Sequence, residues 1–276
     1  MKLQLDESLL VHKSNLRQKQ VRAGRPREKE LVEIALIDYE KYITGLNQTE
    51  IAAGKFASAV ASLESYIQAA KRLEKAHKLF NWRSDYAGSI IPEFLYRMIA
   101  SVAHARGIAP LFTTRESIVE ITYSGAVDGA CNLRHKNQDL TVGLRTDTII
   151  VRGEAVTFVV PIVVLEVKTN IDINKLNGLD FSAARLKRSF PAARYLLVTE
   201  TIDFSLTDDY ASGSLDQVYV LRKVLRARNR RAVERLQSDV FEALVSDVVN
   251  LLKRESDPRG HVYERLRDGR LIGHAV

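Results

Sequence analysis

Glu166 and Lys168 stand one residue apart at the end of an apolar stretch of seven residues, Val159 to Leu165. That stretch is rich in β-branched side chains and predicts a strand buried on both faces. Residues i and i+2 of a strand point to the same face, so a carboxylate and an ammonium emerge there side by side. A lone Glu-x-Lys is most often a strand-end salt bridge, so other residues must decide between that interpretation and a cation-binding site.

A second carboxylate, Asp139, lies 27 residues before Glu166, at the start of a predicted strand that precedes the buried one. If the two strands are neighbours, Asp139 comes alongside the Glu166 end. Two carboxylates and the backbone carbonyl of Val167 are hard oxygen ligands suited to Mg²⁺. A bound metal lowers the pKa of a water molecule. Lys168 would orient that water, or lose its own proton under the influence of the metal, and would stabilise developing negative charge.

Glu93 is a further candidate ligand, for the same metal or for a second one. It falls in the first turn of a predicted helix that this order of elements packs against the sheet. A glutamate at a helix N-terminus is also favoured by the helix dipole alone. Both interpretations stay open on the sequence.

Length and composition bound the remaining function classes. With 276 residues, 46% hydrophobic and 27% charged, the chain has the profile of a globular protein with a substantial core. No apolar run is long enough to span a bilayer and no signal peptide is evident, so we expect no membrane partner. Cys131 is the only cysteine, which excludes an internal disulfide and favours the cytoplasm. The six histidines show no paired metal spacing, which argues against zinc.

The net charge of +7 is concentrated in two arginine-rich patches. Residues 13–29 and 221–235 each carry seven basic residues against one acidic residue. Such patches are typical of proteins that bind a polyanion, although a solvated basic face is the ordinary alternative for either patch alone. Together with a possible metal site, they favour a nucleic-acid partner.

Hydrophobic periodicity predicts a polar, basic lead-in over residues 1–27, followed by helices and then strands. Ser89 is the expected N-cap of the third helix, and Asp239 and Glu242 have the spacing of a capping box at the last one. The expected elements are helices over 28–45, 55–78 and 89–106, strands over 117–124, 139–143, 148–151 and 157–168, a helix over 180–190, strands over 195–199 and 217–221, and a helix from 239.

Four runs of the sequence resemble a subunit of the BbvCI-type restriction endonucleases. They are residues 80–97, 166–172, 175–183 and 260–263. The resemblance implies an α/β fold of the PD-(D/E)xK class, with a mixed central sheet flanked by helices and an N-terminal helical extension. It also implies Mg²⁺-dependent cleavage of double-stranded DNA to 5′-phosphate and 3′-hydroxyl ends. Two related subunits would assemble on an asymmetric site and each would cut one strand, so a heterodimer is favoured over a homodimer.

Carried over onto this chain, the resemblance assigns Glu166 and Lys168 to the Glu-x-Lys half of the motif and Asp139 to its leading aspartate. Gln138 stands where the motif has proline. Arg83 in the polar loop 81–85 and three residues of the helix over 180–190 are candidates for DNA contact: Arg185, Lys187 and Arg188.

The nuclease core is expected over residues 81–225, between helical regions at 1–80 and 226–276 that form one integrated domain with it. Two alternatives stay open. The chain could be a non-catalytic, sequence-specific DNA-binding subunit on a decayed nuclease fold, which the joint presence of Asp139, Glu166 and Lys168 argues against. It could also be a DNA-repair nuclease, such as a junction-resolving enzyme, on the same core.

Overall fold

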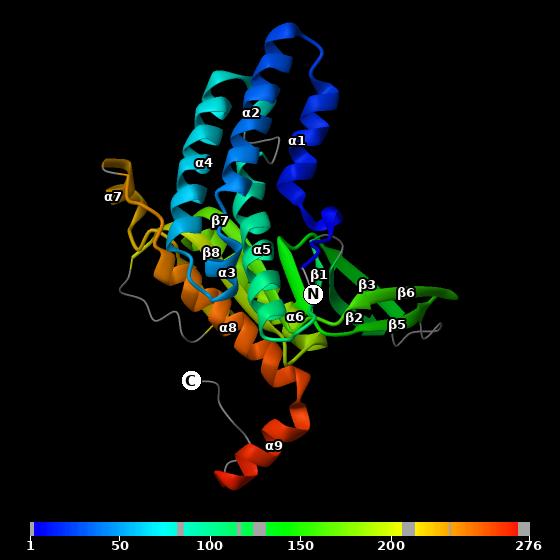
Figure 1. Ribbon diagram of the computed structural model, residues 1–276. Coiled ribbons are helices and arrows are strands. Elements are labelled where there is room, and N and C mark those ends of the chain that lie inside the picture. Colours follow the sequence, from blue (N-terminus) through cyan, green and yellow to red (C-terminus); the bar gives the residue numbers. More distant parts are fainter. Residues whose placement is uncertain are drawn as a thin grey trace.

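A five-stranded sheet forms the centre of the molecule in the computed structural model, which describes residues 3–81, 86–114, 117–123, 131–205, 213–231 and 233–269 (Figure 1). Its strand order is β1-β4-β7-β8-β9. β7 is the middle strand, antiparallel to β4 and parallel to β8. The five strands are β1 (Leu111–Thr113), β4 (Leu140–Gly143), β7 (Val163–Asp172), β8 (Arg194–Asp203) and β9 (Gln217–Val220).

Helices cover both faces of this sheet. α6 (Ile173–Ser189) connects the parallel strands β7 and β8, as a crossover helix must. Short 3₁₀ turns occur at Glu7–Leu9, Lys78–Phe80 and Ala87–Ser89. The other helices are α1 (Val11–Arg22), α2 (Pro26–Thr44), α3 (Gln48–Ala52), α4 (Ala57–Ala76), α5 (Ile90–Ala105), α7 (Arg226–Arg231), α8 (Ser238–Ser256) and α9 (Pro258–Arg267).

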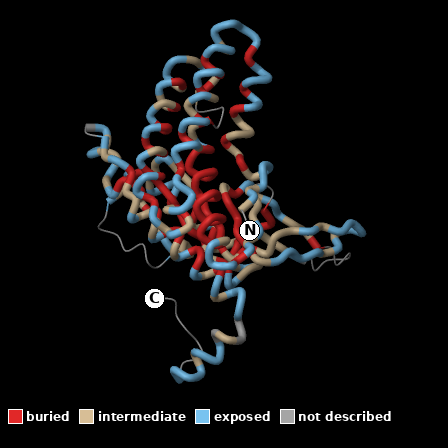
Figure 2. Tube along the Cα trace, in the orientation of Figure 1, coloured by how far each residue is buried: buried red, intermediate tan, exposed pale blue. Residues whose placement is uncertain are grey.

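Alternation along β7 divides its side chains between the two faces. Val163 and Leu165 join the main hydrophobic core with α5 and α8, whereas Val164 packs with Tyr195 and with Leu186 of α6. The main core runs from Leu10 to Leu252 and draws buried residues from all three predicted regions of the chain. Buried residues concentrate in α5 and the central strands (Figure 2).

Two β-hairpins lie together at one side of the sheet (Figure 1). One is formed by β2 (Ser117–Tyr123) and β3 (Cys131–Lys136), and the other by β5 (Thr146–Val151) and β6 (Glu154–Val159). The second hairpin turns at Arg152 and Gly153, with φ angles of 51° and 86°. A two-residue turn with two positive φ angles matches the twist of an antiparallel pair, which explains the glycine there.

The sequence predicts most of these elements. The helices over 28–45, 55–78 and 89–106 are confirmed as α2, α4 and α5, and the strands over 195–199 and 217–221 as parts of β8 and β9 with small shifts at the ends. The strand expected over 157–168 is two strands, β6 and β7, because the chain is interrupted around Pro161, which cannot donate to a ladder. The helix expected over 180–190 begins earlier, at Ile173, where Asp172 accepts a hydrogen bond from the Lys175 N–H (2.9 Å).

Ser89 is the N-cap residue of α5, as predicted, but its side chain does not cap the helix, and the capping box predicted at Asp239 and Glu242 is wrong. The Ser89 hydroxyl donates to the carbonyl of Tyr86 and makes no capping bond to α5. Helix α8 begins at Ser238 without a side-chain cap, and Glu242 instead accepts a hydrogen bond from the Phe56 N–H (3.1 Å). Glu242 therefore ties α8 to the start of α4.

The polar, basic lead-in predicted over residues 1–27 contains a helix that the sequence analysis did not predict, α1. The inward side chains of α1 include polar groups, so the sequence has no apolar stripe that would predict this helix. His12 is buried, and its ring nitrogens lie 2.9 Å from the Ser89 hydroxyl and 2.5 Å from the Tyr66 hydroxyl. Polar docking of this kind carries no hydrophobic period that sequence analysis could detect.

Burial of His12 makes the free energy of unfolding depend on pH. Burial, which Glu93 opposes, lowers its pKa from 6.5 to about 4. The unfolded chain therefore binds a proton that the folded chain refuses, and stability is lost as pH falls from 6.5 towards 4. We expect the wild type to lose about 3 kcal/mol more than His12→Asn over that interval. Chemical denaturation at pH 7.5, 6 and 4 measures the difference, and parallel curves for the two proteins would contradict it.

None of the helices in the described part of the chain is both long and apolar enough to cross a membrane.

Candidate active site

Asp139, Glu166 and Lys168 lie together where β4 begins, beside the middle strand of the sheet. Leu140, the first residue of β4, is paired with Leu165 of β7, so Asp139 falls alongside Glu166 and beyond the last pair. One Asp139 oxygen, Oδ2, accepts a hydrogen bond from the Val167 N–H (2.7 Å). The backbone of β7 therefore fixes the aspartate that the sequence placed near it.

Lys168 bridges the two carboxylates. Its Nζ lies 2.9 Å from Oε2 of Glu166 and 3.5 Å from Oδ2 of Asp139. Glu166 is buried, whereas Asp139 and Lys168 keep about a third of their side chains exposed, at 32% and 36%. The cluster is thus open to solvent on the side of Asp139 and Lys168 and closed behind Glu166.

The cluster shifts the pKa of each of its three groups. Burial raises the pKa of Asp139 to about 6, Lys168 opposes the shift, and the charge of Glu166 adds to it. Burial also opposes ionisation of Glu166, but Lys168 and Lys136 outweigh it and lower that pKa. For Lys168, the two carboxylates outweigh burial and raise its pKa. Opposed shifts in two neighbouring carboxylates are typical of functional sites.

Sequence analysis missed two residues of this cluster, Lys136 and Tyr195. Lys136 Nζ lies 2.5 Å from Oε1 of Glu166 and 3.1 Å from the Tyr195 hydroxyl. That hydroxyl lies 3.1 Å from the same Glu166 oxygen and 3.4 Å from Oε1 of Gln138. Lys136 comes from β3, three residues before Asp139, while Tyr195 reaches the site because β8 pairs Tyr195 with Val164. Only the strand register reveals Tyr195.

The structure does not bring Glu93 to this cluster. Its helix, α5, belongs to the core on the opposite face of the sheet from Glu166. Glu93 is buried, and its oxygens accept hydrogen bonds from the Tyr39 hydroxyl (2.6 Å), the Lys13 N–H (2.9 Å) and Arg97 (3.1 Å). These contacts join α1, α2 and α5, so Glu93 is accounted for as a structural group and we leave it out of the proposed metal site.

The predicted DNA-binding residues have different surroundings. Arg83 lies outside the described residues. Arg185 pairs with Glu120 (3.2 Å) and lies over the Phe181 ring, 5.1 Å from its centroid. Lys187 pairs with Asp216 (2.8 Å), whereas Arg188 is exposed. Contact of these side chains with DNA stays a prediction. Of the three residues on α6, Arg188 is the most exposed to solvent.

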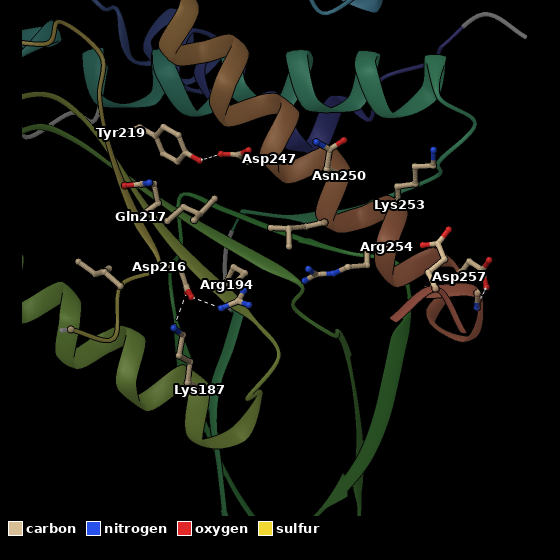
Figure 3. Close-up of a pocket in the computed structure, with 16 residues that line it drawn as sticks. Lys187, Arg194, Asp216, Gln217, Tyr219, Asp247, Asn250, Lys253, Arg254 and Asp257 are labelled. Carbon is tan, nitrogen blue, oxygen red and sulfur yellow. Dashed lines mark hydrogen bonds and ion pairs between the residues drawn. The ribbon is translucent and has the colours of Figure 1, made fainter. Parts of the chain in front are cut away.

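A wide cleft of about 900 Å³ opens elsewhere, between α6, β9 and the helices α8 and α9 (Figure 3). Asp216 there pairs with both Lys187 and Arg194 at 2.8 Å, and the Tyr219 hydroxyl donates to Asp247 (2.5 Å). Asp139, Glu166 and Lys168 do not line it. Because the cleft lacks the motif residues, we place the chemistry at the smaller carboxylate cluster of Asp139 and Glu166.

The donor set of that cluster fits a hard divalent cation. Two carboxylates converge on one ammonium, so a positive charge already occupies the position between them. Within the described residues no third acidic, histidine or cysteine side chain joins them. Mg²⁺ binds proteins through one or two carboxylates and takes its other ligands from water, carbonyl groups and substrate phosphate. Asp139 and Glu166 meet that requirement.

This mixed sheet, with an aspartate ahead of one strand and Glu-x-Lys on the next, is the arrangement of a restriction-endonuclease-like nuclease. Comparisons with known proteins give the same class. The family model of the Bpu10I restriction endonuclease matches residues 87–266. Among solved structures, the chain is similar to one described as the native BbvCI A2B2 tetramer at low resolution, with a TM-score of 0.69 and 41% identity over 94% of this chain and 100% of that one.

No curated protein sequence matches the chain. The family model covers more than half of it, and the chain belongs to the Bpu10I restriction endonuclease family. It is a type II restriction endonuclease subunit, a site-specific deoxyribonuclease.

Proposed function

We propose that this subunit hydrolyses one DNA strand at a short specific site in a Mg²⁺-dependent reaction that leaves 5′-phosphate and 3′-hydroxyl ends. The observation that carries the proposal is the Lys168 ammonium held between Glu166 and Asp139, in a chain of a restriction endonuclease family. A decayed, purely DNA-binding fold would have no reason to keep a buried glutamate ionised beside two lysines.

Asp139, Glu166 and the backbone carbonyl of Val167 would hold the metal. The N–H and C=O of a strand residue point to the same edge of the strand. Because the Val167 N–H meets Asp139, its carbonyl emerges on that side as well, past the end of β4. Bound there, Mg²⁺ would lower the pKa of a water molecule and stabilise charge on the phosphate.

Lys168 would act on the attacking water and on the phosphate. Its ammonium lies on the solvent-exposed side of the cluster, held by Glu166 and Asp139. From there it can donate to the water and stabilise the negative charge that develops on the phosphate oxygens. Asp139 is oriented by the Val167 N–H, which holds its Oδ2 within reach of the Lys168 ammonium.

We further propose that a related second subunit completes the enzyme, in the bacterial cytoplasm where its double-stranded DNA substrate lies. The BbvCI structure that this chain resembles is described as an A2B2 tetramer, an assembly of two kinds of subunit. This chain offers one cluster of Asp139, Glu166 and Lys168, which suits the cutting of one strand. A heterodimer therefore explains double-strand cleavage, and a homodimer would require a symmetric site.

A supercoiled-plasmid assay tests the proposal. With Mg²⁺, we expect nicked circles from the chain alone and defined linear fragments when the second subunit is added. Removal of the metal from Asp139 and Glu166 with EDTA should stop DNA cleavage. It should not unfold the protein, because no described element depends on the metal for its packing. Linear fragments from the chain alone would indicate a homodimer. Cleavage that persists in EDTA, or DNA binding without any cleavage, would overturn the proposal.

A further inference from the structure

The two oxygens of Glu166 have different partners. Oε1 lies 2.5 Å from the Lys136 ammonium and 3.1 Å from the Tyr195 hydroxyl, while Oε2 lies 2.9 Å from the Lys168 ammonium. A carboxylate oxygen has two lone pairs. Two donors therefore engage both lone pairs of Oε1, whereas among the described residues one ammonium contacts Oε2. Oε2 is also the oxygen on the side of Asp139, since Lys168 reaches both.

Oε1 of Glu166 lies on the closed side of the site. Glu166 is 3% exposed and Tyr195 is fully buried, whereas the Lys136 side chain keeps 32% exposure. Lys136 comes from the β2–β3 hairpin, and Tyr195 from β8 of the central sheet. The Glu166 carboxylate is thus held by side chains from two separate sheets, which restricts its rotation about the Cγ–Cδ bond.

Gln138 extends this arrangement. It stands where the nuclease motif has proline, its side chain is buried, and its Oε1 lies 3.4 Å from the Tyr195 hydroxyl. The hydroxyl is therefore set between the Gln138 amide and Glu166. A glutamine at this position supplies a polar contact that proline cannot supply, so the departure from the motif adds to the site.

We propose that Lys136 and Tyr195 are positioning residues that engage Oε1 of Glu166 and leave Oε2 as the oxygen offered to the catalytic metal. This inference rests on the proposed nuclease function and assigns a role to two residues outside the Asp139–Glu166–Lys168 motif. Partners that orient a metal ligand commonly change activity by about 10-fold to 100-fold when they are removed.

The proposal predicts that metal binding and cleavage change in opposite directions in Lys136→Met. Loss of the ammonium removes a positive charge that competes for Glu166, so Mn²⁺ should bind the DNA-free protein about fivefold more tightly. Loss of the fixed carboxylate should slow cleavage at saturating Mg²⁺ by about 10-fold to 100-fold. A lysine that only stabilised the fold would weaken both together and lower the melting temperature.

The experiment combines paramagnetic resonance of free Mn²⁺ with plasmid cleavage by the full chain assembled with its second subunit. Tyr195→Phe removes a hydrogen bond but no charge, so it should slow cleavage with little change in Mn²⁺ affinity. Lys71→Met is the matched control, because Lys71 also pairs with a buried glutamate, Glu200 (3.2 Å), that is not part of the motif. It should leave both measurements unchanged.

The outcomes separate this inference from the function beneath it. If Lys136→Met cleaves at the wild-type rate, or binds Mn²⁺ no more tightly than the wild type, Lys136 does not position Glu166 and the nuclease proposal still stands. If the wild type does not cleave and Glu166→Gln binds Mn²⁺ as the wild type does, the metal site itself is refuted.

Discussion

Lys168→Glu should abolish cleavage by this subunit, with a loss of at least about 10³-fold, and leave DNA binding intact. The substitution places a third carboxylate between Asp139 and Glu166, where the structure has an ammonium 2.9 Å from one and 3.5 Å from the other. The new side chain can neither donate to an attacking water nor stabilise negative charge on the phosphate. Beside a wild-type second subunit, the variant should convert plasmid to nicked circles that stop short of linear DNA.

Lys75→Glu is the matched control for this charge reversal. Lys75 lies on the exposed face of α4, in the helical region and outside the motif. It changes the net charge by the same amount, so any loss that came from repulsion of DNA as a whole would appear in both variants. Gel-shift binding in Ca²⁺ and the melting temperature complete the comparison. Wild-type cutting by Lys168→Glu would remove Lys168 from the mechanism.

The sequence carried enough information to place the motif. The alternation of side chains along a strand brought Glu166 and Lys168 to one face, and the spacing to Asp139 suggested a neighbouring strand. The structure does make β4 and β7 neighbours, although the β5–β6 hairpin lies between them in the sequence. Local periodicity and the direction of side chains depend on a few adjacent residues, which explains why these features could be predicted from the sequence.

Tyr195 and Lys136, which contact Glu166 on its buried side, could not be predicted from the sequence in this way. Tyr195 reaches the carboxylate only because β8 runs parallel to β7 with Tyr195 opposite Val164, a register set by the α6 crossover. Lys136 depends on how the β2–β3 hairpin is placed against the central sheet. Helix α1 docks through His12, without an apolar stripe. Each of these relations is tertiary, and no pattern of neighbouring residues encodes it.

Arg222→Met should lower the free energy of unfolding by about 3 to 5 kcal/mol, the largest loss of stability that we expect from a single ion-pair change in the described residues. The Arg222 side chain is 1% exposed. It pairs with Glu64 (2.9 Å) and Glu200 (2.7 Å) and also donates to the carbonyl of Glu234. Removing the guanidinium leaves two buried carboxylates without their common partner.

The position of this network explains why its loss would lower the stability of the whole protein. Glu64 belongs to α4 and Glu200 to β8, and Arg222 lies two residues after the end of β9. Glu64 also accepts a hydrogen bond from the Leu236 N–H (2.8 Å), just before α8. The N-terminal helices, the sheet and α8 therefore meet at one set of buried charges. For a chain of this size we expect the melting temperature to fall by about 10 °C.

Arg226→Met provides the control, because Arg226 pairs with Asp203 (3.0 Å) at the surface, where both side chains are 41% exposed. Exposed pairs contribute no more than about 1 kcal/mol, so this variant should unfold close to the wild type. Urea denaturation of the two variants and the wild type measures the difference at constant pH. Equal midpoints for the two variants would show that the buried network adds no more stability than a surface ion pair. A low midpoint for Arg222→Met alone would establish it as the link between the helical region and the nuclease sheet.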